Sequence, residues 1–134
     1  MRQKLTIRNE RGQTMTEFAF VLPVLLVVVL GIVQFGIVFN NYVTLTDAVR
    51  AGARKAAVSR NQSNPAGVCK AAVIAAADNL DISSGVLNVT CTPSNSWQPG
   101  SDVVVHADYP YDINLLGFVV KSGRLNSTTT ERVE

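Results

Sequence analysis

Few side chains in this 134-residue sequence are of the types that carry out chemistry, and their spacing matches no catalytic motif. His106 is the single histidine, and it falls in an alternating pattern that is typical of a strand. No serine or cysteine stands at a spacing that would make His106 a general base. We therefore expect a structural role for this histidine.

Aspartates in the second half of the chain could supply oxygen ligands for calcium. They are Asp78, Asp81, Asp102, Asp108 and Asp112. Their intervals do not follow an EF-hand loop, so we interpret them as solvated turn residues. The sequence also has no Gly-rich phosphate loop and no Cys-x-x-Cys pair. We therefore expect no catalytic residue, no cofactor and no metal, and a protein that is not an enzyme.

The two cysteines, Cys69 and Cys91, both follow the long apolar segment of the chain. An even number of cysteines in a small exported domain favours one disulfide. Two separate buried thiols are the alternative. A bond between these residues would stabilise the domain by about 3 kcal/mol in the chain-entropy description.

Glu17 stands directly before this apolar segment. The run from Phe18 to Phe39 has 22 residues and no charged side chain. As a helix it spans roughly 33 Å, enough to cross a hydrocarbon core of about 30 Å. The Glu17 carboxylate either lies in the headgroup region or pairs with a positive charge. A cut after Gly12 would give Gln13 a new α-amino group one helical turn from Glu17, and packed neighbouring helices could bring another subunit's amine within reach.

Charge is concentrated at the start of the chain. The first 12 residues hold four basic groups and one acidic group, whereas the remaining 122 residues carry a net charge of −1. This distribution gives no support to nucleic-acid binding. The basic residues near the apolar run predict a cytoplasmic N-terminus and an exported C-terminal part. An uncleaved signal anchor has the same pattern.

The helical pattern continues beyond the apolar run. Small and apolar residues recur at helical spacing and predict one helix from about residue 14 to residue 60. Its packing face holds Leu45, Ala48, Val49, Gly52, Ala53, Ala56 and Ala57. A break at Asn40-Asn41 is the alternative. Pro23 lies inside the apolar run, where it removes one backbone donor and favours a kink or a loosened turn.

The remainder of the chain predicts a small α+β domain. We expect an alanine-rich helix over 65–80 and strands over 86–92, 102–109 and 124–132. Pro110 is expected to end the second strand, and 115–120 to form a short helix or an apolar loop. The chain then divides into a basic leader (1–12), a transmembrane helix (13–40), an amphipathic stem helix (41–60) and an exported α+β domain (61–134).

Several of these residues resemble a known family. Gly12 followed five positions later by Glu17-Phe18 is similar to the processing site of type IV prepilins. Over residues 11–60 the chain more closely resembles the TadE-like pseudopilins of the tight-adherence (Flp, type IVb) pilus system. The residues that carry this likeness are Arg11-Gly12, Glu17-Phe18-Ala19, Leu22-Pro23, Gln34-Phe35-Gly36 and the Ala-Val-Arg-Ala-Gly-Ala-Arg segment at 48–54.

The resemblance implies a type IV pilin-like fold and a minor pseudopilin that takes part in pilus assembly and adherence. It implies cleavage between Gly12 and Gln13 by a prepilin peptidase. Assembly would use Glu17, Phe18 and Pro23, and the stem helix would pack through Ala48, Gly52, Ala53 and Ala56. The implied partners are the peptidase, other pilins and pseudopilins (TadF-like and Flp-like), an inner-membrane assembly platform and membrane lipid.

The implied location is the bacterial inner membrane, crossed once, with the globular part in the periplasm, outside the cell or in the pilus. A different class of function fits the same residues. In that alternative the protein is an unprocessed, signal-anchored binding module in the periplasm or outside the cell.

Overall fold

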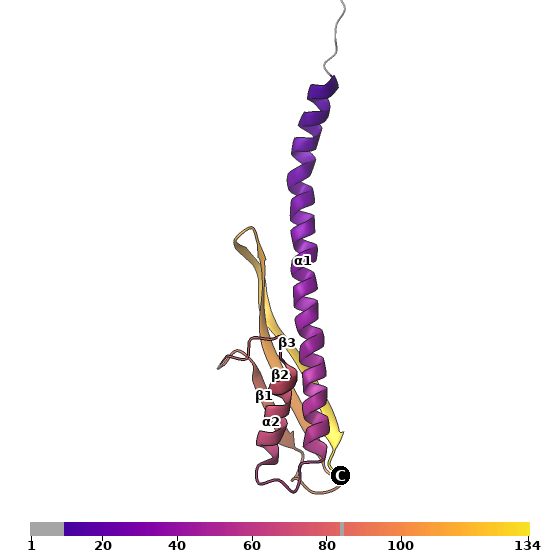
Figure 1. The fold of residues 1–134 in the computed structure, drawn as a ribbon, viewed down its shortest axis with the longest axis vertical. Coiled ribbons are helices and arrows are strands. Elements are labelled where there is room, and N and C mark those ends of the chain that lie inside the picture. The colour runs from indigo at the N-terminus through magenta and orange to yellow at the C-terminus, as the bar shows by residue number, and fades with distance from the viewer. Residues whose placement is uncertain (1–9, 84) are drawn as a thin grey trace, which may run out of the picture.

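The structure, a computed structural model, describes residues 10–83 and 85–134. The helices of this part of the chain are α1 (Glu10–Ala57) and α2 (Pro65–Ala76). The strands β1 (Asn88–Pro93), β2 (Asp102–Leu115) and β3 (Phe118–Arg132) form an antiparallel sheet in the order β1-β2-β3. Figure 1 shows α1 as a long rod, with the other elements beside its C-terminal half. The predicted α+β class, with a long N-terminal helix and a small antiparallel sheet, is confirmed.

Helix α1 is continuous over 48 residues, which corresponds to a length of about 72 Å. It passes through Pro23 and through Asn40-Asn41, so the predicted alternative of a break at the two asparagines is wrong. The helix begins at Glu10, earlier than the predicted residue 14. Residues 1–9 of the basic leader lie outside the described residues.

The C-terminal end of α1 is held by the rest of the domain. The helix ends at Ala57, three positions before the predicted end. Both the backbone N–H and the hydroxyl of Ser59 donate to the Ala56 carbonyl, at 3.1 and 3.0 Å. The Glu134 N–H donates to the Ala57 carbonyl at 3.0 Å, so the end of the chain returns to the end of α1.

One face of α1 forms the centre of the core. The residues of this face that are buried are those that the helical spacing had selected, Leu45, Ala48, Val49, Gly52, Ala53, Ala56 and Ala57. Helix α2 packs closely over Gly52, where a β-carbon would lie 2.2 Å from Val73 Cγ2 and 3.4 Å from the Cys69 carbonyl oxygen. A glycine is therefore required here by the close approach of the two helices.

Helix α2 has clear end signals. The Asn64 side chain accepts a hydrogen bond from the Gly67 N–H at 2.9 Å, and Pro65 occupies the first turn, where its missing N–H costs nothing. The helix ends at Ala76, four residues before the predicted end, although Leu80 is still buried. Cys69 of α2 and Cys91 of β1 form a disulfide, which joins the helix to the sheet.

The β2–β3 hairpin is much longer than the sequence predicts. Strand β2 continues through Pro110 to Leu115, and residues 115–120 form the end of a hairpin, not a short helix or a loop. Strand β1 pairs with β2 only as far as Asp108, so Pro110 lies where β2 has a neighbour on one side only, a position that proline tolerates. Leu116 and Gly117 make the turn with φ values of 53° and 89°, the two positive φ angles of a type I′ turn.

The contact at Gly52 leads to a stability prediction. We expect Gly52→Ala to lower the free energy of unfolding of the C-terminal α+β domain by about 1–3 kcal/mol, because the added methyl group overpacks against Val73. Fluorescence of Trp97, the single tryptophan, reports denaturation of the full chain in detergent micelles, since this side chain packs against the core.

The matched control is Gly36→Ala, at which a β-carbon meets nothing within 4 Å. The double variant Gly52→Ala/Val73→Ala should recover part of the loss, as expected for residues in contact. A Gly52→Ala chain as stable as the unmodified protein would show that α2 does not approach α1 this closely.

The disulfide gives a second prediction. Cys69 and Cys91 are 22 residues apart, so replacing both by alanine should lower the free energy of unfolding by about 3 kcal/mol. The same Trp97 assay measures the loss, and reduction of the unmodified protein is the control. Free thiols that react with a labelling reagent in the unreduced, folded protein would contradict the bond.

Candidate assembly site

The N-terminal half of α1 is exposed on every side. All side chains from Gly12 to Val29 are exposed, and an 18-residue window of the helix has a mean hydropathy of 2.8 with none of it buried. Among the described residues, α1 is the helix whose length and composition allow it to cross a membrane. Apolar surface of this extent requires lipid or other apolar helices around it. The helix therefore fits a single-pass membrane anchor.

The predicted processing residues lie at the exposed start of this helix, in one turn. The Gln13 Nε2 donates to Glu17 Oε1 at 3.2 Å, an i,i+4 contact along one helix face. The Thr16 hydroxyl donates to the Gly12 carbonyl oxygen at 2.9 Å. A β-carbon at Gly12 would meet nothing within 4 Å, so packing inside this chain does not require a glycine there.

Phe18 and Pro23 lie further along the same exposed helix. The Phe18 side chain is 61% exposed, so it is available to a neighbouring molecule. Just beyond, the side chains of Leu22, Leu25, Leu26 and Val29 border a shallow apolar depression. This part of α1 presents an apolar surface with a single carboxylate, Glu17, at its N-terminal edge.

The other predicted residues lie at the opposite end of α1. Ala48, Ala53 and Ala56 are fully buried against α2 and the sheet, with Gly52 between them. Glu17 is 31 positions from Ala48, a separation of about 46 Å along the helix. The structure thus places the predicted processing and assembly residues together at one end of α1 and the packing residues together at the other.

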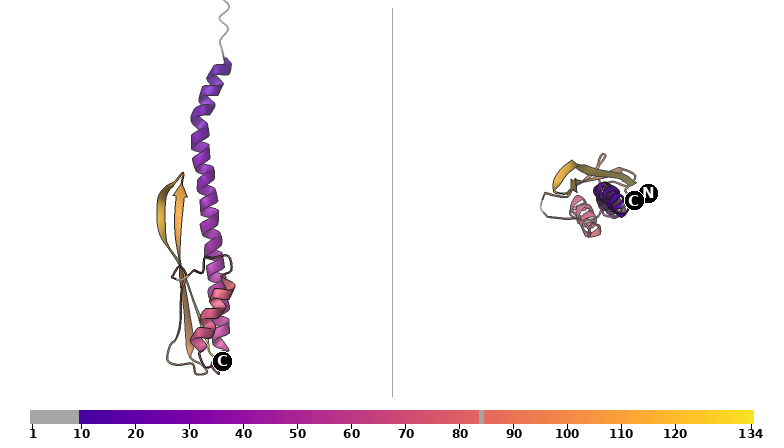
Figure 2. Two further views of the ribbon diagram at one scale, coloured as in Figure 1. Left: turned by 60° about the vertical axis from the view of Figure 1, so that its left-hand side comes forward. Right: turned by 90° about the horizontal axis from the view of Figure 1, so that it is seen from above.

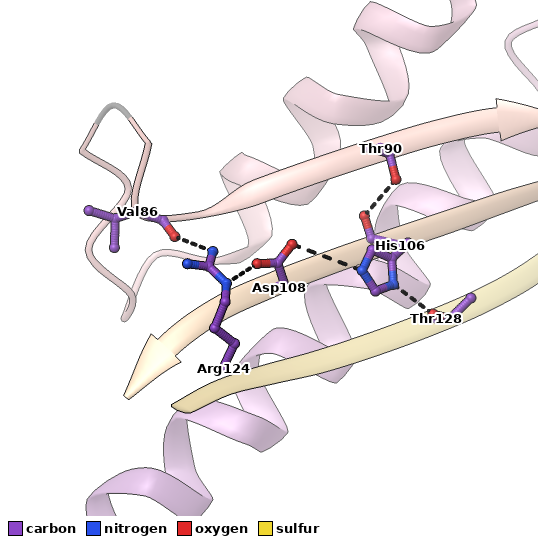
Figure 3. A network of polar contacts seen from close by, with 6 residues as sticks. All are labelled: Val86, Thr90, His106, Asp108, Arg124 and Thr128. Atoms are coloured by element: carbon purple, nitrogen blue, oxygen red, sulfur yellow. Dashed lines mark hydrogen bonds and ion pairs between the residues drawn. The ribbon is translucent and has the colours of Figure 1, made fainter. Parts of the chain in front are cut away.

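A polar cluster lies on the outer face of the sheet (Figure 3). The His106 Nδ1 is 2.8 Å from the Thr128 hydroxyl on β3, and its Nε2 is 3.9 Å from Asp108 Oδ1. Arg124 donates to Asp108 and also to the Val86 carbonyl, the latter at 3.4 Å. The imidazole therefore sits in a cross-strand network that joins β2 and β3, with no nucleophile of the serine or cysteine type in the cluster drawn.

The aspartates considered as calcium ligands are spread over several elements. Asp81 accepts hydrogen bonds from the hydroxyl and the backbone N–H of Ser83, which hold the pKa of this carboxyl below its usual range. Asp102 lies 3.8 Å from Arg132, and Asp108 pairs with Arg124. Within residues 10–83 and 85–134, no three histidine, cysteine, aspartate or glutamate side chains are placed to hold a metal ion.

Sequence reasoning missed one surface, the apolar end of the β2–β3 hairpin. Leu116, Phe118, Val119 and Val120 are all strongly exposed there. The available signal was the run Leu-Leu-Gly-Phe-Val-Val at 115–120, which has no polar residue and lies between Asn114 and Lys121. The run was assigned to a short helix or a loop with apolar anchors, so its exposure was not foreseen.

Comparison with known proteins agrees with the residues at the start of the chain. Residues 12–54 match the family model described as TadE-like protein. No curated protein and no solved structure gave a significant match to the chain. The matched segment covers Gly12, Glu17, the apolar run and most of the stem face. The resemblance drawn from these residues is confirmed, and residues 12–54 are similar to the TadE-like family.

Proposed function

We propose that this protein is a minor pseudopilin that takes part in assembling a Flp/Tad-type (type IVb) pilus used for adherence. The observation that carries the proposal is the TadE-like segment at 12–54, in which α1 exposes an apolar surface bounded by Glu17. The TadE-like family consists of pilus-related structural proteins, which supports a structural role over an enzymatic one.

Processing after Gly12 is the first step in this proposal. The helix begins at Glu10, so the bond between Gly12 and Gln13 lies in its first turn, and Thr16 bonds the Gly12 carbonyl. A peptidase must therefore unwind this turn before it reaches the bond. Glycine favours such unwinding because it is about 1 kcal/mol less favourable than alanine inside a helix.

Assembly through α1 is the second step. After cleavage, the α-amino group of Gln13 and the Glu17 carboxylate lie on the same turn of helix. A carboxylate that enters an apolar bundle without a partner costs a few kcal/mol, so an amine from a neighbouring subunit would fix the axial register of two helices. The prepilin peptidase, TadF-like and Flp-like proteins and the inner-membrane platform are the partners that this proposal requires.

The proposal places the protein in the bacterial inner membrane, with a cytoplasmic N-terminus and an exported domain. The disulfide supports export of the domain, because disulfides persist in oxidising compartments. An unprocessed, signal-anchored binding module remains the second candidate, since an apolar helix near the N-terminus serves that role equally well.

The processing step separates the two candidates. We expect the membrane-resident protein in its native host to begin at Gln13, as measured by intact mass and N-terminal sequencing. Gly12→Leu should block trimming, because a bulky residue replaces the glycine before the cut. Gly36→Leu is the matched control, since both glycines are exposed on α1 and neither has a neighbour within 4 Å of a β-carbon. A chain that still begins at Met1 when the peptidase is present would support the signal-anchored module.

The carboxylate gives a separate prediction. Glu17→Ala should leave membrane insertion and trimming intact but reduce co-purification with the other pilins. A lost pair worth about 1.4 kcal/mol would lower the association constant roughly tenfold. Thr16→Ala is the control, because it changes the neighbouring residue and keeps the charge. Co-assembly that is unchanged in the Glu17→Ala chain would refute the pairing of Glu17 with an amine.

A further inference from the structure

The hairpin tip, defined as residues 115–120, is an apolar surface that this chain does not cover. Its side chains include Leu116, Phe118, Val119 and Val120, which are 63%, 78%, 61% and 61% exposed. Below the tip, residues of β2 that face the core, such as Tyr109 and Tyr111, are partly buried, and Asp108 and Asp112 on the alternate face are polar. At the tip this alternation is lost, and apolar side chains point to both sides of the hairpin.

The height of the tip along α1 is the second observation. The left view of Figure 2 keeps the vertical axis of Figure 1, and both views show the tip beside the middle of α1, away from the rest of the domain. Strand β3 has 15 residues, or about 50 Å, and the chain returns to Ala57 directly after it. Phe39 is 18 positions before Ala57, about 27 Å along the helix. The hairpin therefore extends past the level of Phe39, to the level of the apolar run.

We propose that the hairpin tip is a second membrane contact, which inserts into the outer leaflet of the bilayer that α1 spans. Lipid fits this surface because the tip is apolar on both sides and lies level with the apolar run of α1. Lys121 follows the tip directly, opposite Ile113, and its ammonium group can reach the phosphates of the headgroups. The inference rests on the membrane anchor and goes beyond the pilus role.

Backbone hydrogen bonding limits the depth of insertion. Both long edges of the hairpin near its tip lack a partner strand, and open sheet edges are not stable in hydrocarbon. Only the tip can enter, to a depth of about 5–10 Å, as for other surface-bound apolar segments. Lys121 and Asn114 then lie among the headgroups.

The proposed depth in the membrane also suits the aromatic residues of α1. The level of Lys121 on β3 corresponds to about Gln34 on α1, from a strand rise of about 3.3 Å and a helix rise of about 1.5 Å. Phe35 and Phe39, whose rings stack at 6.4 Å, and Tyr42 then lie in the interfacial zone that aromatic residues favour. About 20 residues before Gln34 the helix reaches Met15, so the hydrocarbon core contains the part of α1 that is exposed on all sides.

The test places a tryptophan at the tip of the full chain. In a Trp97→Phe background, Phe118→Trp is compared with Asn126→Trp, which lies on the exposed outer face of β3 nearer the domain. Each protein is placed as one copy per nanodisc of phosphatidylcholine and phosphatidylglycerol, with and without brominated phosphatidylcholine. Far-ultraviolet circular dichroism and an intact disulfide show that each variant is folded.

We expect the Phe118→Trp chain to emit at shorter wavelength, to be quenched by shallow bromines and to be quenched by iodide several-fold less than the Asn126→Trp chain. Equal iodide quenching of the two folded chains, with no effect of bromine, would overturn the proposal. Protection from iodide without quenching by brominated lipid would also overturn it and would indicate a protein partner. The result does not depend on trimming after Gly12, so it fails or succeeds separately from the pseudopilin proposal.

Discussion

The close approach of α2 to α1 at Gly52 is the contact on which the C-terminal α+β domain depends. Val73 occupies the space that a side chain at position 52 would need, and the Cys69 carbonyl lies beside it. The disulfide from Cys69 then holds β1, and β1 aligns β2 through the register from Asn88 to Pro93. Together with the hydrogen bond from Glu134 to Ala57, these links place every element of the domain relative to the last three turns of α1.

Because α1 is unbroken, a single helix includes both an exposed apolar half and a half that is buried in the core of the domain. Its N-terminal half is covered by nothing in this chain, whereas its C-terminal half supplies the largest share of the small residues in the core. The change occurs gradually along one face, on which Gln34, Val38 and Asn41 are partly buried before Leu45 becomes fully buried. A rigid rod of this kind fixes the rotation and height of the domain relative to Glu17, since no loop between them can absorb a change.

The parts of the fold that could be predicted from the sequence are those set by local periodicity. Small residues at helical spacing identified the stem face residue by residue, because a close helix contact needs side chains of the size of Ala53 or Gly52. The long hairpin could not be predicted, because a proline such as Pro110 commonly ends a strand. In addition, the run at 115–120 lacks the alternation of apolar and polar residues that indicates a strand. Hydrogen bonding to β3 extends β2 past Pro110 to Leu115, and this pairing joins residues up to 30 positions apart in the sequence. The Glu17 motif was visible from spacing alone, whereas the His106–Asp108–Arg124 cluster required the strand register.

If the hairpin tip and α1 enter the membrane as proposed, the rigid link between them means that the depth of the tip and the depth of Glu17 cannot change independently. Moving the helix outward by one turn, about 5.4 Å, lifts the hairpin tip from the leaflet and brings Glu17 toward the hydrocarbon core. Both changes are unfavourable, since apolar tip side chains become hydrated at about 25 cal/mol per Å² and a carboxylate loses water. Movement inward brings the open hairpin edges into lipid, which is also unfavourable. Under these proposals the protein has a preferred depth in the membrane, and it would leave this depth only when neighbouring subunits cover the tip and neutralise Glu17 in the same step.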